Sequence, residues 1–153
     1  GDEAFFDATR QAVYGTPTPK PGHFKPVYGD TKDYIAAVKQ VTGKDYQWFF
    51  DVYLYQAPLP ELIATRNGDR LDLRWKAPGN KPFPMPVEVR VGDEVKTVAM
   101  ANGQGSLPIQ ANQSYTVDPH SFVLRQLAHI DAFQQDKSQR EKEEARKKAA
   151  GGG

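Results

Sequence analysis

The feature that most constrains this 153-residue chain is a change of hydrophobic period at Pro58 and Pro60. Before the two prolines, apolar residues recur at the three- and four-residue intervals of an α-helix, whereas after them apolar and polar residues alternate as in a β-strand. A helix cannot continue through these prolines, because proline lacks an amide donor and fixes φ. The pattern therefore predicts an α+β fold with N-terminal helices followed by strands.

Three helices are expected before the prolines. The first covers residues 2–14 and ends at the proline-rich residues 15–22, from which a loop continues to about Gly29. Asp30 can cap the second helix, which stops at Gly43. The third helix starts at Asp45 and is apolar almost all round, which is typical of a helix buried between other elements. Its apolar residues are Tyr46, Trp48, Phe49, Phe50, Val52, Tyr53, Leu54 and Tyr55.

The segment after the prolines is expected to form antiparallel strands. Residues 61–66 and 70–76 flank Asn67-Gly68-Asp69, which is a hairpin turn sequence. A second hairpin is predicted from residues 87–91 and 95–100, joined at Gly92-Asp93, and shorter strands are expected at residues 106–109, 115–117 and 122–124. This spacing predicts a small antiparallel β-sandwich, with Leu71, Leu73 and Trp75 facing inward.

The end of the chain is expected to be a helix. Leu124, Leu127, Ile130 and Phe133 lie at helical intervals, and residues 134–148 carry almost nothing apolar. Opposite charges three and four positions apart stabilise such a helix in water. The predicted organisation is thus a helical segment over residues 1–58, a β-sandwich domain over 59–125 and a charged helical tail over 126–153.

Composition narrows the classes of partner. The chain has 20 basic and 19 acidic side chains and a formal net charge of +1, so no overall field would attract a phosphate backbone, and nucleic acid is not an expected partner. There are no cysteines, which excludes disulfides and thiolate metal sites. No apolar run reaches the roughly 18 residues of a transmembrane helix, so no membrane-spanning segment is expected. The composition does not indicate a cellular compartment.

Residues that could carry chemistry are few. His23, His120 and His129 include no pair at helical i, i+4 spacing, so no His-Glu-x-x-His zinc motif is present. The sequence Asn102-Gly103-Gln104-Gly105 is interpreted as a turn rather than a phosphate loop. The aromatic residues of the third helix and Trp75 could stack on a sugar or peptide, but their placement favours a core role. We therefore expect no catalytic, cofactor-binding or metal-ligating residue in this chain.

Several motifs carry a resemblance to a known enzyme family. Together, the motifs of residues 1–6, 33–41, 43–45, 48–51 and 58–62 resemble the end of the catalytic domain of aminopeptidase N-like zinc metallopeptidases. They read Gly-Asp-Glu-Ala-Phe-Phe, Asp-Tyr to Val, Gly-Lys-Asp, Trp-Phe-Phe-Asp and Pro-Leu-Pro-Glu-Leu. The segments 71–75, 84–89 and 115–119 look like the β-sandwich that follows in bacterial members. The resemblance covers about residues 1–125.

The resemblance implies an enzyme that removes N-terminal residues from peptides. Such an enzyme would hold zinc through two histidines and a glutamate, use a second glutamate as general base, bind the substrate amino group through an acidic motif and stabilise the oxyanion with a tyrosine. All of these would precede Gly1, and no residue of this chain matches them. The first hypothesis is therefore a non-catalytic C-terminal fragment of a bacterial zinc aminopeptidase, inactive alone, that serves as a scaffold.

This hypothesis also names partners. They are the catalytic domain of the parent protein and, through it, the peptide substrates, with zinc belonging to the parent; a periplasmic and a cytoplasmic parent are both compatible with it. The alternative is a stand-alone β-sandwich module that binds peptide or carbohydrate through exposed aromatic residues. A complete enzyme of an unfamiliar kind is a third, weaker interpretation.

Overall fold

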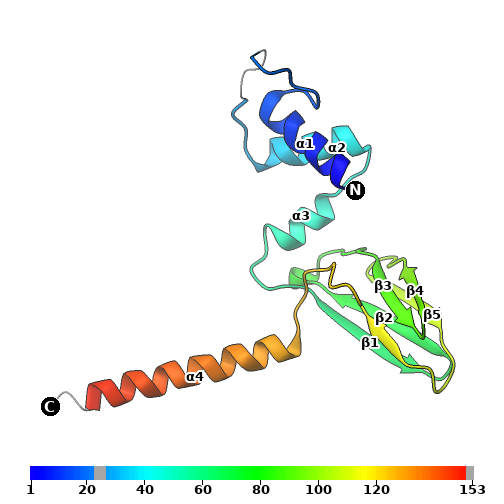
Figure 1. Ribbon diagram of the computed structural model, residues 1–153, viewed down its shortest axis with the longest axis vertical. Helices are drawn as coiled ribbons and strands as arrows, with labels where there is room; N and C mark the ends of the chain where they lie inside the picture. Colours follow the sequence, from blue (N-terminus) through cyan, green and yellow to red (C-terminus); the bar gives the residue numbers. More distant parts are fainter. Residues whose placement is uncertain (23–26, 151–153) are drawn as a thin grey trace. The chain divides into compact units, whose positions relative to one another are not determined.

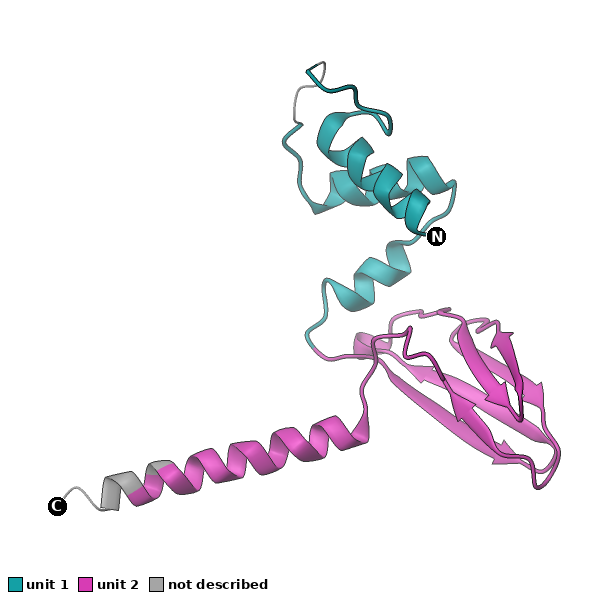
Figure 2. Ribbon diagram, in the orientation of Figure 1, with its two compact units in different colours: residues 1–57 teal, residues 58–153 magenta. Residues whose placement is uncertain are grey.

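The computed structural model describes residues 1–22 and 27–150, and the chain divides into two compact units (Figure 2). The first unit is Gly1–Ala57 and the second is Pro58–Gly153. The described residues form four α-helices, one short 3-10 helix and two three-stranded antiparallel sheets (Figure 1). The predicted α+β fold class is confirmed.

The helical unit contains α1 (Asp2–Tyr14), α2 (Thr31–Thr42) and α3 (Gln47–Tyr53). Helix α2 begins as the sequence predicts, because the Asp30 carboxylate accepts hydrogen bonds from the amides of Lys32 (2.7 Å) and Asp33 (3.2 Å). The Asp33 carboxylate in turn accepts one from the Asp30 amide (2.8 Å), which completes a capping box. The helix ends at Gly43, whose φ of 66° is the left-handed conformation of a C-cap glycine.

Helices α1 and α2 pack against each other. Each helix buries one small residue, Ala8 in α1 and Ala37 in α2. The Thr9 hydroxyl of α1 also lies 3.4 Å from the Tyr34 hydroxyl of α2. Small side chains bury little apolar area, so this interface contributes less hydrophobic stabilisation than one lined by Leu or Phe.

The expectation that the third helix is buried between other elements is wrong. Helix α3 is only seven residues long, starts at Gln47 rather than Asp45, and fully buries just Val52 among its residues. Its rings pack largely on one another: Phe49 contacts the rings of Trp48, Phe50 and Tyr53 at centroid distances of 6.0, 5.5 and 4.8 Å. The aromatic side chains therefore stay half-buried, and Leu54 and Tyr55 beyond the helix are exposed.

The second unit contains both sheets. The first sheet has the strand order β1-β2-β5, and the second has the order β4-β3-β6. The strands are β1 (Glu61–Asn67), β2 (Arg70–Lys76), β3 (Val87–Val91), β4 (Glu94–Val98), β5 (Gln104–Pro108) and β6 (Tyr115–Val117). A 3-10 turn, η1 (Pro78–Asn80), lies between β2 and β3. Both predicted hairpins form: Glu61 pairs with Lys76 and Val87 with Val98.

The two sheets bury the side chains that alternate inward along their strands. Those of β2 are Leu71, Leu73 and Trp75, and those of β3 are Val87, Val89 and Val91. The Trp75 indole donates a hydrogen bond to the Met85 carbonyl (2.8 Å), and its ring meets the ring of Phe83 edge-on at 5.1 Å. Each fully buried large apolar side chain contributes about 1.5–3 kcal/mol relative to an exposed one. The predicted core position of Trp75 is therefore confirmed.

Residues 122–124, predicted as a strand, are not one. The chain turns sharply before them, because Asp118 and Ser121 adopt positive φ values of 52° and 54°. The amides of Phe122 and Val123 then bond to the Asp118 carboxylate instead of a neighbouring strand (2.9 and 3.4 Å). Strands β2, β3 and β6 have their predicted bounds, and the bounds of β1, β4 and β5 differ from the predicted ones by one or two residues.

The last helix, α4 (Ala128–Ala150), starts later than the apolar spacing from Leu124 suggested. Residues 124–127 form no helix, and the Gln126 amide donates to the Pro60 carbonyl (2.9 Å). This bond ties the start of α4 to the start of β1. In the part of the chain that the structure describes, no helix is long and apolar enough to cross a membrane.

Candidate functional site

The three histidines occupy different surroundings. His23 lies outside the described residues, and His129 is exposed in the first turn of α4. The His120 Nδ1 atom lies 2.8 Å from the Glu88 carboxylate, but 44% of the His120 side chain is exposed. This exposure favours a surface hydrogen bond over an acid-base pair enclosed in a cleft. Within residues 1–22 and 27–150, no three His, Cys, Asp or Glu side chains are grouped so that they could hold a metal ion.

The first glycine of the pair forms a turn with Asn102, as the sequence predicts, whereas Gly105 lies in β5. Gly103 has a φ of 78°, and its amide donates to the Met100 carbonyl (3.1 Å). Its own carbonyl accepts a hydrogen bond from the Trp75 amide (2.8 Å). The turn therefore connects the segment after β4 to the sheet that contains β2. The Gly103 amide is already hydrogen-bonded within the fold.

A buried carboxylate organises the corner that follows β6. The Asp118 side chain is only 3% exposed, and it accepts the hydrogen bonds from Phe122 and Val123 described above. The Asp118 amide donates to the Glu88 carbonyl of β3 (2.7 Å). We call residues 118–125 the Asp118 corner. It fixes the exit of the chain from the second sheet.

Arg125 completes this corner and is incompletely satisfied. Its Nε atom lies 3.6 Å from an Asp118 carboxylate oxygen, and its side chain is 20% exposed. Among the described residues, this Nε atom is a buried donor without a hydrogen-bond acceptor. Leaving a buried donor unpaired costs about 1–3 kcal/mol, and the opposite charge of the Asp118 carboxylate offsets part of this cost.

The corner opens into a groove of about 590 Å³, which we call the α4 groove. It lies between the Pro58-Leu59 segment, the corner residues and the first turns of α4. Its wall is mainly apolar, and Phe122 is 75% exposed at its edge. The volume is in the range of about 300–1,000 Å³ that is typical of ligand pockets. The lining residues are Pro58, Leu59, Ser121, Phe122, Val123, Leu124, Arg125, Gln126, Leu127, Ile130, Asp131 and Gln134.

The apolar residues that line this groove are recognisable in the sequence, but their arrangement as a groove is not. The spacing of Leu124, Leu127 and Ile130 was interpreted as one helical stripe, whereas only Ile130 belongs to α4. The corner depends on the Asp118–Glu88 and Gln126–Pro60 backbone hydrogen bonds, which join residues that are distant in sequence. The only local signal is Asp118-Pro119, a turn-forming pair.

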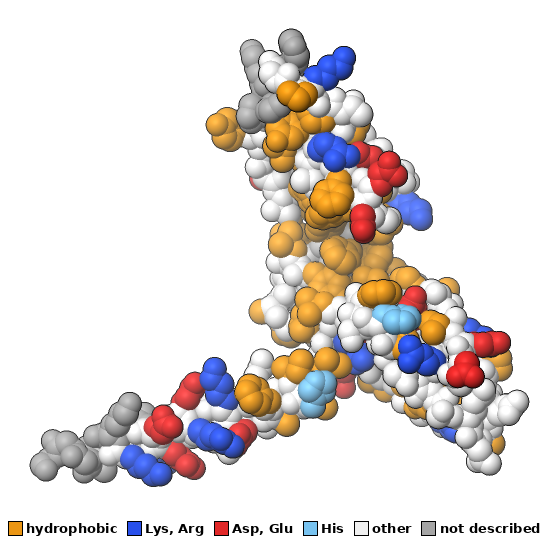
Figure 3. All heavy atoms as spheres, viewed as in Figure 1, with side chains coloured by type: hydrophobic (Ala, Val, Ile, Leu, Met, Phe, Trp, Pro, Cys, Tyr) orange, Lys and Arg blue, Asp and Glu red, His pale blue; other side chains and the backbone are white. Residues whose placement is uncertain are grey.

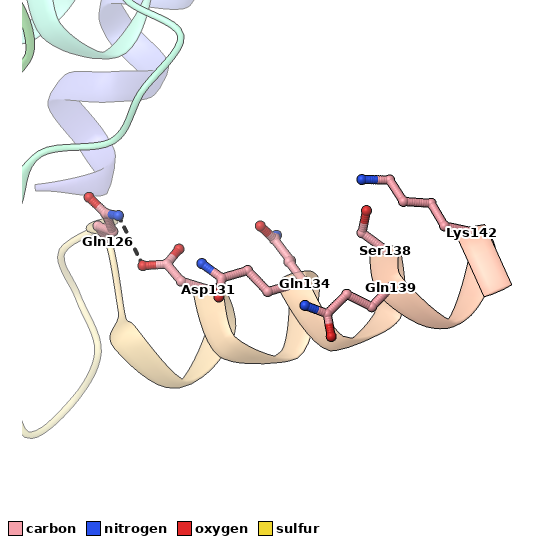
Figure 4. Close-up of a pocket in the computed structure, with 7 residues that line it drawn as sticks. Gln126, Asp131, Gln134, Ser138, Gln139 and Lys142 are labelled. Carbon is pink, nitrogen blue, oxygen red and sulfur yellow. Dashed lines mark hydrogen bonds between the residues drawn. The ribbon is translucent and has the colours of Figure 1, made fainter.

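A second hollow runs along α4 itself and is polar. Figure 4 shows its side chains, with the Gln126 amide bonded to the Asp131 carboxylate (2.9 Å). Apart from Gln126, all of its lining residues project from the one helix, so no second element fixes their positions. The lining residues are Gln126, Asp131, Gln134, Gln135, Ser138, Gln139 and Lys142.

Two carboxylates outside these hollows have lowered pKa values. The hydrogen bond from the Lys39 side chain, followed by that from the Gln47 amide, lowers the pKa of Asp45. The hydrogen bond from the Asn67 side chain, followed by that from Arg70, lowers the pKa of Asp72. Asp45 is exposed at a helix start and Asp72 is half-buried beside a hairpin turn, and neither is enclosed in a cleft, so neither indicates an acid-base site.

The helical unit exposes large apolar side chains. Phe5 and Phe6, adjacent in α1, are 58% and 54% exposed, and their rings meet edge-on at 5.4 Å. Figure 3 shows hydrophobic side chains gathered over this unit and at the start of α4, with charges of both signs along the rest of α4. Among the described residues of the unit, the other exposed large apolar side chains are Val13, Val27, Tyr28, Leu54 and Tyr55.

Comparisons with known proteins give a distant structural similarity. No protein family and no curated protein matches the chain. Among solved structures, 57% of the chain is similar to aminopeptidase A of Legionella pneumophila, crystallised in complex with aspartic acid, with 20% sequence identity and a TM-score of 0.39. The matched region spans 12% of that protein's chain.

Proposed function

We propose that this chain is a non-catalytic C-terminal part of a bacterial zinc aminopeptidase and that it serves as a scaffold for the catalytic domain. The observation that carries the proposal is the uncovered apolar surface of the helical unit, above all Phe5 and Phe6 on α1. Exposed apolar side chains that gather on one region mark an interaction surface. The unit is therefore proposed to bury this surface against the catalytic domain.

The identity of that partner comes from the sequence motifs. The segments 1–6, 48–51 and 58–62 resemble the end of a zinc aminopeptidase catalytic domain, and they include the exposed Phe5 and Phe6. In this proposal the zinc ligands and the general base lie in the catalytic domain, so no step of peptide hydrolysis is assigned to this chain. The chain would contribute buried apolar area to the interface, and burying one phenylalanine stabilises such an interface by about 1.5–3 kcal/mol.

The first experiment asks what the natural gene encodes upstream of Gly1. The proposal expects the open reading frame to continue upstream into a His-Glu-x-x-His segment. It also expects the 153-residue chain alone to bind no stoichiometric zinc and to leave aminoacyl anilides intact. Zinc at one equivalent by elemental analysis, or a frame without the zinc motif, would overturn it.

A second experiment uses the parent protein. Phe5→Ser and Phe6→Ser together should lower its thermal midpoint and its activity, because polar side chains would replace apolar ones in the docked surface. Lys20→Ser, an exposed change in the loop after α1, is the control and should change neither. An unchanged Phe5/Phe6 double variant would contradict the scaffold proposal.

The alternative of a stand-alone sugar- or peptide-binding module has less support. It needs exposed aromatic rings on the strands, but Trp75 is buried. Tyr115 is half-buried, and the Arg66 guanidinium lies 5.4 Å from the centre of its ring. Ready quenching of the fluorescence of both Trp48 and Trp75 by acrylamide would favour the module; the scaffold proposal expects Trp75 to be protected.

A further inference from the structure

We propose that the outer edge of β1 pairs with β1 of a second copy of this chain, antiparallel and centred on Ala64, so that the first sheets of the two copies join into one. Strand β1 stands at the end of the order β1-β2-β5, so it has a paired neighbour on one side only (Figure 1). The inference does not depend on the proposed function, because it follows from backbone groups and side chains of the sheet unit.

The first argument is the direction of the backbone groups of β1. In an antiparallel sheet, the amide and carbonyl of one residue point to the same side, and successive residues point to opposite sides. The Trp75 amide of β2 donates to the Gly103 carbonyl (2.8 Å), away from β1, so the groups of Leu62, which faces Trp75, point to the outer edge. By the same alternation, those of Ala64 and Arg66 also point outward. Within the part of the chain that the structure describes, these outward groups have no backbone partner.

The second argument is that this edge already accepts a backbone partner at its start. The Pro60 carbonyl, on the same side as the Leu62 groups, accepts a hydrogen bond from the Gln126 amide (2.9 Å). Beyond this bond, the row of outward groups continues along β1. Such a row at the edge of a sheet is a template for the addition of another strand.

The third argument comes from the other edge strands, which carry features that disfavour strand addition. In β4, the charged Lys96 lies opposite the buried Val89 and therefore on the inward face of the edge. Strand β5 ends at Pro108, and β6 has only three residues. Strand β1 has seven residues without proline or glycine, and residues 61–64 are half-buried. Since inward charges, prolines and short strands are the usual protection of an edge, β1 is the edge best suited to a partner strand.

The fourth argument concerns the identity of the partner, because β1 is complementary to itself. Its only charged residues are Glu61 and Arg66, and in the register centred on Ala64 neither faces a residue of like charge. Pairing through the same strand of both copies uses the same surface twice and closes as a dimer. The facing pairs, one residue from each copy, would be Glu61–Asn67, Leu62–Arg66, Ile63–Thr65 and Ala64–Ala64.

The dimer is expected to be weak, because a seven-residue edge buries less area than a standard protein interface. A Kd on the order of 100 µM corresponds to such a contact. Sedimentation velocity on the 153-residue chain, from about 5 to 500 µM, should therefore show a monomer that becomes a dimer as concentration rises.

Two double variants test the register. Ile63 and Thr65 lie on the outer face of the sheet, opposite Arg74 and Asp72 of β2, so replacing them leaves the buried side chains in place. Ile63→Glu with Thr65→Lys places opposite charges face to face across the dimer, whereas Ile63→Lys with Thr65→Lys places like charges there. The first variant should dimerise at least about tenfold more tightly than the second, because like charges directly opposite disfavour pairing.

Val95→Lys, an exposed change on β4, is the matched control and should dimerise as the unchanged chain does. A measurement without any substitution is amide hydrogen exchange, in which the Ala64 amide should exchange more slowly at the high concentration than at the low one. A monomer at every concentration, equal dimerisation of the two double variants, or unchanged exchange at Ala64 would overturn the inference. So would a dimer that Phe5→Ser abolishes, because α1 would then be the contact. None of these outcomes bears on the upstream reading frame, so either proposal can fail while the other stands.

Discussion

The two units differ in what they bury. The sheet unit encloses large side chains such as Leu71, Leu73 and Phe83, whereas the described part of the helical unit fully buries only Ala8, Ala37 and Val52. Buried apolar area is the main favourable term in folding, so the sheet unit has a core of its own and the helical unit has little. The difference indicates that the sheet unit is the more stable body, and the scaffold proposal adds that the helical unit gains stability from a partner.

The largest expected change in stability separates a buried phenylalanine of the sheet unit from an exposed one of the helical unit. Phe83→Ala removes a ring that is buried against Trp75 and should lower the free energy of unfolding by about 3–5 kcal/mol. Phe5→Ala removes an exposed ring and should change it by about 0.5 kcal/mol or less. Urea denaturation followed by tryptophan fluorescence measures both. Similar losses for the two variants would break the comparison.

A close backbone approach in the sheet unit gives the next effect. A Cβ atom at Gly105 would lie 2.6 Å from the Ala99 carbonyl oxygen and 2.8 Å from the Val98 side chain. Gly105→Ala should therefore destabilise the sheet unit by about 1–3 kcal/mol, because the backbone must move to make room. The neighbouring exposed change Ser106→Ala is the control and should be close to neutral in thermal unfolding. A neutral Gly105→Ala would mean that β5 is less closely packed than described.

The capping box of α2 tests whether the helical unit unfolds separately from the sheet unit. Asp30→Ala removes the acceptor of two amide hydrogen bonds and should cost about 1 kcal/mol of helix stability. Because the helical unit has little core, the loss should appear in the helical circular dichroism signal while the tryptophan signal of the sheet unit persists. Lys32→Ala, exposed in the first turn, is the control. Simultaneous loss of both signals would show that the units unfold together.

The smallest expected effects are on stability at acidic pH. The pKa values of Asp45 and Asp72 are lowered in the folded protein, so each carboxylate contributes stability that is complete above its unfolded pKa of about 3.9 and is lost as pH falls through its folded pKa. Asp45→Asn should flatten the acid dependence in the helical unit, and Asp72→Asn should do so in the sheet unit. Carboxyl titration by NMR checks both; a midpoint at or above the ordinary value would contradict the hydrogen bonds from Lys39 and Asn67.

Local sequence signals predicted much of the fold. The cap at Asp30 and the hairpin turns at residues 67–69 and 92–93 were recognised because their signals are contained within a few residues. The inward positions of β2 follow from period-two alternation, which is also local.

The misassigned elements depend on burial and on partners outside the segment itself. The strand predicted at residues 122–124 is replaced by hydrogen bonds to Asp118, only four and five residues earlier, whose carboxylate is buried by the fold. The apolar composition of α3 predicted a core helix, but burial of its rings requires surface that the helical unit does not supply. The α4 groove escaped prediction for the same reason, because Leu59 and Ile130 meet there only through the tie between Gln126 and Pro60.

Native-state hydrogen exchange on the 153-residue chain tests the central claim most directly, because it reports the stability of each element separately. We expect the amides of β2 and β3 to exchange only with global unfolding of the sheet unit, and those of α1, α2 and α3 to exchange much faster through local opening. Equal protection of α1 and β2 would contradict the claim that the helical unit relies on a partner for its stability.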